Sequence, residues 1–160
     1  MEKQKYTYDY PRPAVTTDCV VFAHDGNGLS ILLIQRGGEP YKGAWAFPGG
    51  FLNMDETAEQ GALRELQEET GLELNHVTQI GAFTEVDRDP RSRVITIAFY
   101  AFSKKCEVKG GDDAALAQWF PIDQLPKLAF DHESILREAI EKMRRDAYFD
   151  KSAELTQTRP

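Results

Sequence analysis

Three glutamates in residues 49–72 could hold a metal ion: Glu65, Glu68 and Glu69. Spacings of three and four residues place side chains on one face of an α-helix. Carboxylates this close repel one another unless a cation or solvent offsets their negative potential. The ordinary alternative is an amphipathic helix whose acidic face is simply solvated, because runs of charge usually face water. The chemical hypothesis is a bound divalent metal ion.

The residues around these glutamates extend the pattern. Gly50 is followed after five residues by Glu56, and seven further residues lead to Arg64. Residues 64–72 then read RELQEETGL. The whole arrangement resembles the Nudix hydrolase box and matches it at nine positions. A lone ExxEE string would favour the solvated helix, whereas nine positions in register favour the metal site.

The resemblance implies roles for the acidic residues of the box. Glu65, Glu68 and Glu69 would be the metal ligands and the centre of catalysis, and a backbone carbonyl near Gly49 or Gly50 would complete the set. Hard carboxylate oxygens select Mg²⁺, with Mn²⁺ as the alternative. In that chemistry the metal offsets charge on the phosphoryl oxygens and lowers the pKa of an attacking water.

Arg64 and Glu56 resemble the ion pair of the family's catalytic box. Its role would be to hold the preceding loop against the helix. The alternative is an ordinary surface ion pair, which contributes only about 0 to 1 kcal/mol to stability.

Arginines near the box are the candidates for substrate binding. The segment DRDPR at residues 87–91 separates two predicted strands, and Arg88 and Arg91 would offer planar donors to phosphate or ribose oxygens. Arg36, at the start of a Gly- and Pro-rich loop, is the third candidate. A solvated turn made rigid by Pro90 is the alternative for the DRDPR segment. That segment, and AFDH at residues 129–132, resemble the ADP-ribose-directed branch of the Nudix family.

A second acidic loop lies at residues 110–113, which read GGDD. In several members of the family an acidic residue from a loop in this region assists metal binding or activates water. Asp112 and Asp113 are therefore candidates for the general base. Gly-Asp runs are also common in simple turns, so the alternative is a turn without a chemical role.

Hydrophobic patterning predicts the elements that must position these residues. We expect strands over 14–22 and 29–35 joined by a turn, two more over 77–86 and 93–102, and a short one over 117–121. The box helix should run over 58–70, between a capping box at 57–60 and a glycine C-cap at 71. A second helix should run from Asp131 to about Tyr148. The resemblance implies an α/β fold, the Nudix α/β/α sandwich with a mixed β-sheet between helices.

Length and composition indicate one domain over residues 1–160, with an extended N-terminal arm at 1–13 and a loose tail at 150–160. The aromatic arm makes a homodimer plausible. A net charge of −7 and a pI of about 5.0 argue against nucleic acid and anionic membranes as partners. The sequence contains neither a membrane-spanning run nor a secretory signal.

Cysteines and histidines predict no further site. Cys19 and Cys106 are far apart in apolar, strand-like segments, so we expect buried free thiols and a reducing cytoplasm. His24, His76 and His132 have no spacing typical of metal ligation, and we expect ordinary surface or hydrogen-bonded histidines.

The leading hypothesis is Mg²⁺-dependent hydrolysis of the diphosphate in ADP-ribose or a related nucleoside diphosphate derivative, which for ADP-ribose gives AMP and ribose 5-phosphate. One alternative is a pyrophosphatase that removes oxidised nucleoside triphosphates, because the box binds the diphosphate and not the base. The other is a non-catalytic ADP-ribose-sensing domain, as in bacterial regulators with a winged helix. We expect no winged helix here, since little chain follows Tyr148 and the charge is wrong for DNA.

Overall fold

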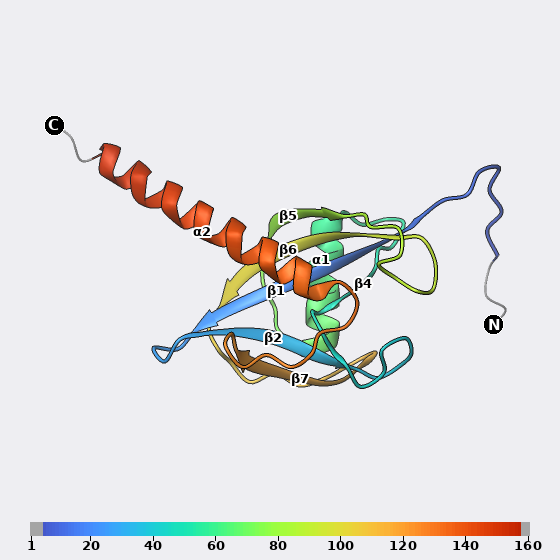
Figure 1. The fold of residues 1–160 in the computed structure, drawn as a ribbon, viewed down its shortest axis with the longest axis horizontal. Helices are drawn as coiled ribbons and strands as arrows, with labels where there is room; N and C mark the ends of the chain where they lie inside the picture. The colour runs from blue at the N-terminus through green and yellow to red at the C-terminus, as the bar shows by residue number, and fades with distance from the viewer. Residues whose placement is uncertain (1–4, 158–160) are drawn as a thin grey trace.

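A mixed β-sheet covered by one helix on each face forms the body of the computed structural model, which describes residues 5–157 (Figure 1). The strands are β1 (Ala14–His24), β2 (Leu29–Arg36), β3 (Trp45–Ala46), β4 (Gly49–Phe51), β5 (Thr78–Phe83), β6 (Val94–Ser103) and β7 (Ala114–Pro121). The helices are α1 (Ala58–Thr70) and α2 (His132–Gln157). This architecture confirms the expected α/β fold.

The central strand β1 has different partners along its length. On one side it pairs in parallel with β6 over its whole length, and β5 follows β6 at the sheet edge. On the other side it pairs with β2 only next to the connecting turn, and with β4 further back. Strand β2 meanwhile pairs with β3 and β7. β1 and β2 therefore diverge, and the candidate site lies between them.

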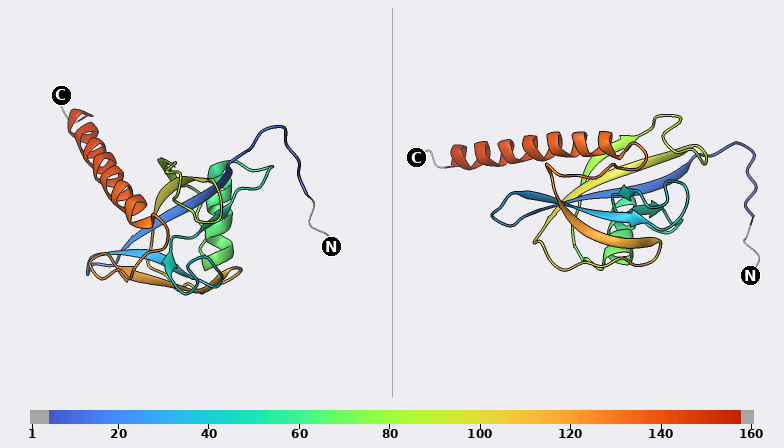
Figure 2. Two further views of the ribbon diagram at one scale, coloured as in Figure 1. Left: turned by 45° about the vertical axis from the view of Figure 1, so that its right-hand side comes forward. Right: turned by 60° about the horizontal axis from the view of Figure 1, so that its bottom comes forward.

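Alternation along β1 determines which helix covers which face. Cys19 and Val21 pack with Leu66 of α1, whereas Val20 and Phe22 pack with Ile135 of α2. Successive strand residues point to opposite faces, so one apolar strand can supply both cores. The two views of Figure 2 show the helices on opposite sides of the sheet.

The ends of α1 are set by local hydrogen bonds. The Thr57 hydroxyl accepts from the Gln60 amide, and the Gln60 side chain accepts from the Thr57 amide. Gly71 ends the helix at φ 73°, a left-handed conformation that glycine adopts without a Cβ clash. The expected limits of this helix are confirmed.

Elsewhere the structure differs from the expected elements. Strand β4 was not expected, and β7 begins at Ala114 rather than at residue 117. Helix α2 continues to Gln157, so residues 150–157, expected as a loose tail, are helical. Residues 158–160 of that tail and 1–4 of the arm lie outside the described residues. Residues 5–13 form neither helix nor strand and project from the body (Figure 1).

The two cysteines differ in exposure. Cys19 is a buried free thiol, as expected. Cys106 is also a free thiol, but its expected burial was wrong, because it is exposed in the irregular segment after β6. Its carbonyl accepts from the Trp119 indole at 2.8 Å. Within residues 5–157, neither helix has the combination of length and apolar character needed to cross a bilayer.

Candidate active site

One cavity of about 660 Å³ brings together nearly all of the candidate residues. Its walls come from β1, β2 and β4, from α1, from the loop residues 88–91 and 112–113, and from the starts of β7 and α2. The lining contains three groups of residues. The acidic side includes Glu65 and Glu69 of α1, the arginine- and phenylalanine-rich side includes Phe130 from the loop before α2, and the buried polar residues Asp18 and His132 are called the floor.

The acidic side contains a group suited to a metal ion. Oxygens of Glu65, Glu68 and Asp112 all lie within 4.8 Å of one another. Glu65 is buried, whereas the other two carboxylates are exposed. Three hard oxygen donors in this arrangement fit Mg²⁺ or Mn²⁺.

Backbone contacts bring the second acidic loop to the helix. The Gly111 amide donates to the Glu69 carbonyl at 3.2 Å, and a Cβ on Gly111 would meet the Glu68 carbonyl at 2.6 Å. This close approach requires glycine, and it places Asp112 in the carboxylate group. Asp113 also lines the cavity, but it lies outside that group.

Glu69, the third expected metal ligand, makes a different contact. Its Oε2 accepts from the Gly49 amide at 2.9 Å, and it does not belong to the group formed by Glu65, Glu68 and Asp112. Burial raises the pKa of the Glu69 carboxyl to about 8, although the Gly49 amide opposes this shift. The contact ties α1 to the first residue of β4.

Gly50 lies directly against another box carboxylate. A Cβ at this position would meet the Glu65 carboxylate at 2.5 Å. The glycine therefore allows the backbone of β4 to approach the acidic group. Burial also raises the pKa of Glu65, while hydrogen bonding to Arg64 opposes that shift.

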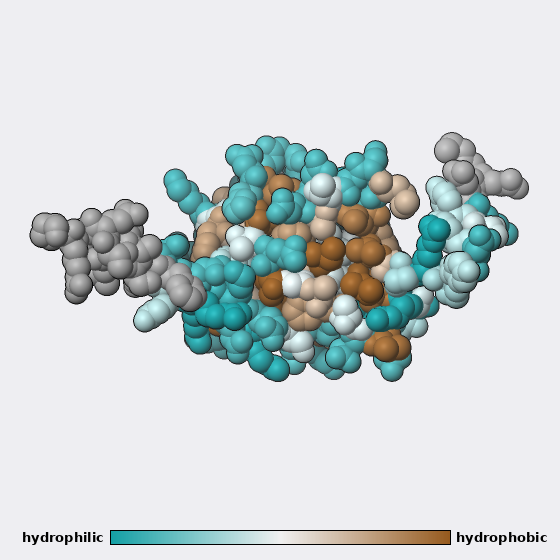
Figure 3. Space-filling model, turned by 90° about the horizontal axis from the view of Figure 1, so that it is seen from above, coloured by the Kyte–Doolittle hydropathy of each residue, from teal (hydrophilic) through white to brown (hydrophobic). Residues whose placement is uncertain are grey.

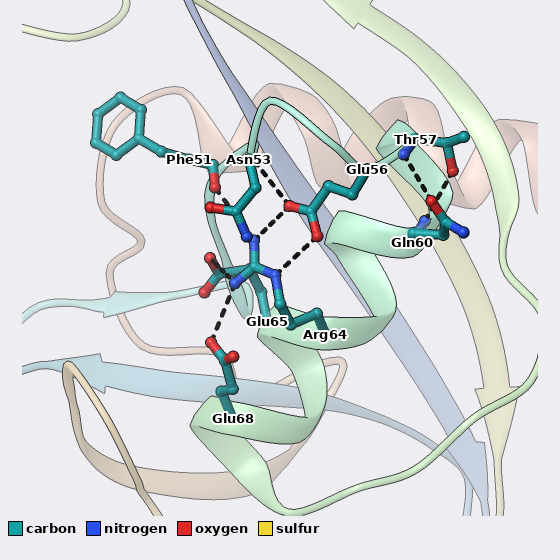
Figure 4. A network of polar contacts seen from close by, with 8 residues as sticks. All are labelled: Phe51, Asn53, Glu56, Thr57, Gln60, Arg64, Glu65 and Glu68. Carbon is teal, nitrogen blue, oxygen red and sulfur yellow. Dashed lines mark hydrogen bonds and ion pairs between the residues drawn. The ribbon is translucent and has the colours of Figure 1, made fainter.

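Arg64 is the centre of a polar network that joins the loop to α1 (Figure 4). Its guanidinium binds Glu56 at two points, at 2.9 and 2.6 Å. It also donates to Glu65 at 2.8 Å and to Glu68 at 3.1 Å. The hydrogen bonds from Arg64 to Glu56 lower the pKa of Glu56 to about 2. The expected Arg64–Glu56 pair is present, and Arg64 additionally orients two carboxylates of the metal group.

Arginine and phenylalanine side chains contact one another in the lining of the same cavity. The Arg91 guanidinium lies 5.1 Å from the Phe51 ring and 5.9 Å from the Phe130 ring. Arg36 lies over Phe130 at 4.9 Å. Phe130 has φ 50°, which is unusual for a bulky residue and indicates a backbone held by its surroundings.

The three candidate arginines differ in their partners. Arg88 is bound at two points by Asp131, and Arg91 is paired with Asp89 at 2.7 Å. Arg36 donates from Nε to the Pro40 carbonyl at 2.7 Å and forms no ion pair with a carboxylate among residues 5–157. Arg36 therefore has the guanidinium most available to an anionic ligand.

The floor contains polar residues that were not expected in the site. His132 Nδ1 accepts from the Phe47 amide at 3.0 Å, and its Nε2 lies 3.5 Å from Asp18 Oδ1. The other Asp18 oxygen accepts from the Thr96 hydroxyl. Burial lowers the pKa of His132, which favours the neutral ring. A charged residue inside the apolar run AVTTDCVVF was the sequence signal for Asp18, and its link to His132 depends on the fold.

A family model and two curated proteins show what the chain is similar to. A family model described as "NUDIX domain" matches residues 12–143. The chain is 43% identical over 129 residues to the ADP-ribose pyrophosphatase of Methanocaldococcus jannaschii, covering 81% of this chain and 74% of that protein. It is 34% identical over 140 residues to the ADPR responsive transcriptional repressor NtrR of Acinetobacter baylyi. That match covers 84% of this chain but only 56% of the repressor.

Solved structures agree with these similarities. The NUDIX domain of Shewanella oneidensis NrtR complexed with ADP ribose has a TM-score of 0.78 and 30% identity, covering 85% of this chain and 94% of that one. A MutT/nudix family protein from Enterococcus faecalis has a TM-score of 0.81 and 32% identity. There the match covers 88% of this chain and 66% of the other.

Proposed function

The chain belongs to the NUDIX domain family and is a Nudix hydrolase, and on that premise we propose that it hydrolyses the diphosphate of ADP-ribose or a related nucleoside diphosphate derivative. The products from ADP-ribose would be AMP and ribose 5-phosphate. One observation carries the proposal: a single cavity is lined by Glu65 and Asp112 of the carboxylate group and also by Arg36, Arg91 and Phe130. The carboxylates suit a cation, and the arginines and the phenylalanine suit the anionic and ring-shaped parts of a nucleotide.

The carboxylates fit Mg²⁺, with Mn²⁺ as the alternative. Glu65, Glu68 and Asp112 would hold the ion, because their oxygens already lie within 4.8 Å of one another. By resemblance to the family, Glu69 and a backbone carbonyl near Gly49 or Gly50 are the further candidates. When bound, such an ion offsets the charge on the phosphoryl oxygens.

The remaining residues bind and orient the substrate. Arg36 would donate to phosphate or ribose oxygens, because no carboxylate among the described residues pairs with it. Phe130, whose half-buried ring lies under Arg36 at 4.9 Å, would contact a ring of the substrate. Asp113 lines the cavity without joining the carboxylate group, so we propose it as the general base that takes a proton from the attacking water.

Hydrolysis of a substrate panel tests the proposal. ADP-ribose, NADH and oxidised dGTP would be incubated with Mg²⁺, and the products identified by mass spectrometry. We expect AMP and ribose 5-phosphate from ADP-ribose, and no reaction by Glu68→Gln with its fold intact. Absence of ADP-ribose turnover together with pyrophosphate release from oxidised dGTP would favour the nucleotide-sanitising alternative.

A sensing domain is the second candidate, favoured by the similarity to a repressor and to an NrtR domain bound to ADP ribose. A sensor would bind ADP-ribose without cleaving it. Calorimetry with and without Mg²⁺, followed by product analysis of the same samples, separates the two functions. Tight binding with intact ligand in Mg²⁺ would support the sensor and contradict the hydrolase.

Assembly and location are further parts of the proposal. Edge strand β5 pairs only with β6 among the described strands, and apolar side chains gather in the middle of the face seen from above in Figure 3. Together with the exposed Tyr6 and Tyr10 of the arm, this supports a homodimer. Light scattering across a concentration series would contradict it by finding a monomer throughout. Two free cysteines suit a reducing cytoplasm, and the charge of −7 makes nucleic acid a poor partner.

A further inference from the structure

The segment between β3 and β4 is held by several elements that are distant in sequence. The Cys19 amide of β1 donates to the Pro48 carbonyl at 2.9 Å. The Gly49 amide donates to Glu69 of α1 at 2.9 Å. The position of this segment therefore determines where the β4 backbone meets the box carboxylates.

A third contact comes from the start of α2. The Phe47 amide donates to His132 Nδ1 at 3.0 Å, and the two rings stack with centroids 5.0 Å apart and an interplanar angle of 11°. Because Nδ1 accepts this hydrogen bond, the proton of the neutral ring lies on Nε2. The Nε2–H then faces Asp18 Oδ1, 3.5 Å away.

We infer that His132 is a positioning residue: by accepting from the Phe47 amide it sets the place of Gly49 and Gly50 beside the carboxylates of α1. The inference rests on the proposed function only in assigning those carboxylates to a divalent cation. His132 itself does not belong to the candidate metal group of Glu65, Glu68 and Asp112. Its effect is transmitted through two residues of backbone.

The geometry separates this role from simple packing. His132 is 3% exposed, so any flat ring could fill its space, but only an acceptor at the Nδ1 position satisfies the Phe47 amide. Phe47 lines the cavity, so an unsatisfied amide could reach water by moving toward it. That movement would carry Gly49 away from Glu69.

Two amide variants differ in the place of one polar atom. In His132→Asn the side-chain oxygen falls near the position of Nδ1, whereas in His132→Gln the polar atoms fall near Nε2. Both remove the ring and its stacking on Phe47, and the shorter Asn leaves the larger void, so a better result for His132→Asn could not come from packing. His76, an exposed histidine outside the cavity, provides the control substitutions His76→Asn and His76→Gln.

The main measurement is Mn²⁺ affinity without substrate, from the electron paramagnetic resonance signal of free Mn²⁺. Substitution of a residue that orients a metal ligand typically lowers metal affinity or activity by about 10- to 100-fold. We expect His132→Gln to bind Mn²⁺ at least about tenfold more weakly, and to lower kcat for ADP-ribose while KM changes by less than about threefold. His132→Asn should restore both kcat and Mn²⁺ affinity to within about threefold of the wild type.

Equal Mn²⁺ affinity and kcat in the Asn and Gln variants would overturn the positioning role, and so would a Gln variant that matches the wild type. If the wild type hydrolyses ADP-ribose in either case, the proposed function survives. A wild type that binds Mn²⁺ but does not cleave ADP-ribose would overturn the proposed function alone, because the Mn²⁺ affinities of the variants would still test the positioning role. A wild type that binds no Mn²⁺ would overturn both.

A measurement on the wild type covers the case in which a variant does not fold. Long-range ¹H–¹⁵N NMR identifies the protonated nitrogen of each histidine. We expect His132 as the neutral ring protonated on Nε2 at neutral pH. A proton on Nδ1 would overturn the inference, because that nitrogen could not then accept from Phe47.

Discussion

Arg88 and Asp131 form a buried two-point ion pair. Nε and one terminal nitrogen of the guanidinium donate to the two carboxylate oxygens at 2.9 and 2.7 Å. The Arg88 side chain is only 3% exposed. The pair links the loop between β5 and β6 to the start of α2, next to Phe130. Arg88, expected to bind substrate, is thus engaged in holding one wall of the cavity.

Removal of this guanidinium should reduce stability strongly. Arg88→Ala leaves Asp131 without its partner in a partly buried place, and breaking a buried pair costs about 3 to 5 kcal/mol. Urea unfolding would measure the loss in free energy of unfolding. Arg93→Ala is the matched control, because Arg93 is exposed and, among residues 5–157, its side chain donates only to the Glu85 carbonyl. Equal losses in the two variants, with a raised KM in Arg88→Ala, would instead support direct substrate binding.

The neighbouring aspartates of the second acidic loop should differ in their effect on metal binding. Asp112 belongs to the carboxylate group with Glu65 and Glu68, whereas Asp113 does not. We expect Asp112→Asn to weaken Mn²⁺ binding by at least about tenfold, since loss of a ligand should exceed the effect of a residue that only orients one. Asp113→Asn should leave Mn²⁺ affinity unchanged and lower kcat. Titration of both variants with Mn²⁺ measures the two affinities. Equal affinities would contradict the placement of Asp112, but not Asp113, in the metal group.

Two glycine substitutions should separate activity from stability. In Gly50→Ala the new Cβ would meet the flexible end of Glu65 at 2.5 Å, so the carboxylate can move at little cost in stability but leaves the metal group. In Gly71→Ala the strain of φ 73° should lower stability by about 1 kcal/mol, and apart from its chain neighbours no described residue has an atom within 4 Å of the new Cβ. We expect Gly50→Ala alone to lose hydrolysis. Thermal unfolding and ADP-ribose turnover of both variants would measure this difference.

Acid should destabilise the protein partly through Glu56. Hydrogen bonding to Arg64 lowers the pKa of Glu56 from 4.5 to about 2 in the folded protein. The unfolded chain therefore binds more protons between these values, and this contribution to stability, complete above pH 4.5, is lost as the pH falls toward 2. Glu56→Gln should show a shallower decline of stability in acid. Urea midpoints across this range provide the measurement, with exposed Glu59→Gln as the control.

Arg36 should determine affinity for the substrate. Charge-assisted hydrogen bonds contribute about 1.5 to 3 kcal/mol, so Arg36→Gln should raise KM for ADP-ribose roughly 10- to 100-fold. Arg36→Lys should recover part of the affinity, because it keeps the charge but loses the planar donor pair. Steady-state kinetics would show the change in KM. Arg137→Gln, on the exposed side of α2, should match the wild type.

Elements with strong local signals were predictable from the sequence. Helix α1 matched its expected limits, because Thr57, Gln60 and Gly71 specify its ends through contacts within a few residues. Strand β4 was missed because it has three residues, and its pairing depends on β1, which lies far away in sequence. The end of α2 was placed too early, since its amphipathic pattern weakens before the helix stops.

The contacts of the site also divide into local ones, which the sequence indicated, and distant ones, which it did not. The Arg64–Glu56 pair was expected from the resemblance to the Nudix box, and both residues lie within one loop and the helix that follows it. The partners of Arg88 and His132 were not expected, because Asp131 lies 43 residues from the first and Phe47 lies 85 residues from the second. Whether an arginine is free for substrate, or a histidine orients backbone, depends on such tertiary contacts. A sequence can supply the residues without showing these pairings.

The parallel pairing of β1 and β6 determines how early the sheet can form during synthesis of the chain. Ala14 pairs with Val94, so β1 leaves the ribosome long before its neighbour in the sheet exists. Until β6 follows, the nascent chain exposes an apolar strand edge that favours contacts with other chains or with chaperones. Non-local pairing of this kind also slows folding. Asp18, on that strand, can therefore meet Thr96 and His132 only after residue 132 has left the ribosome, so the cavity floor cannot form earlier in synthesis.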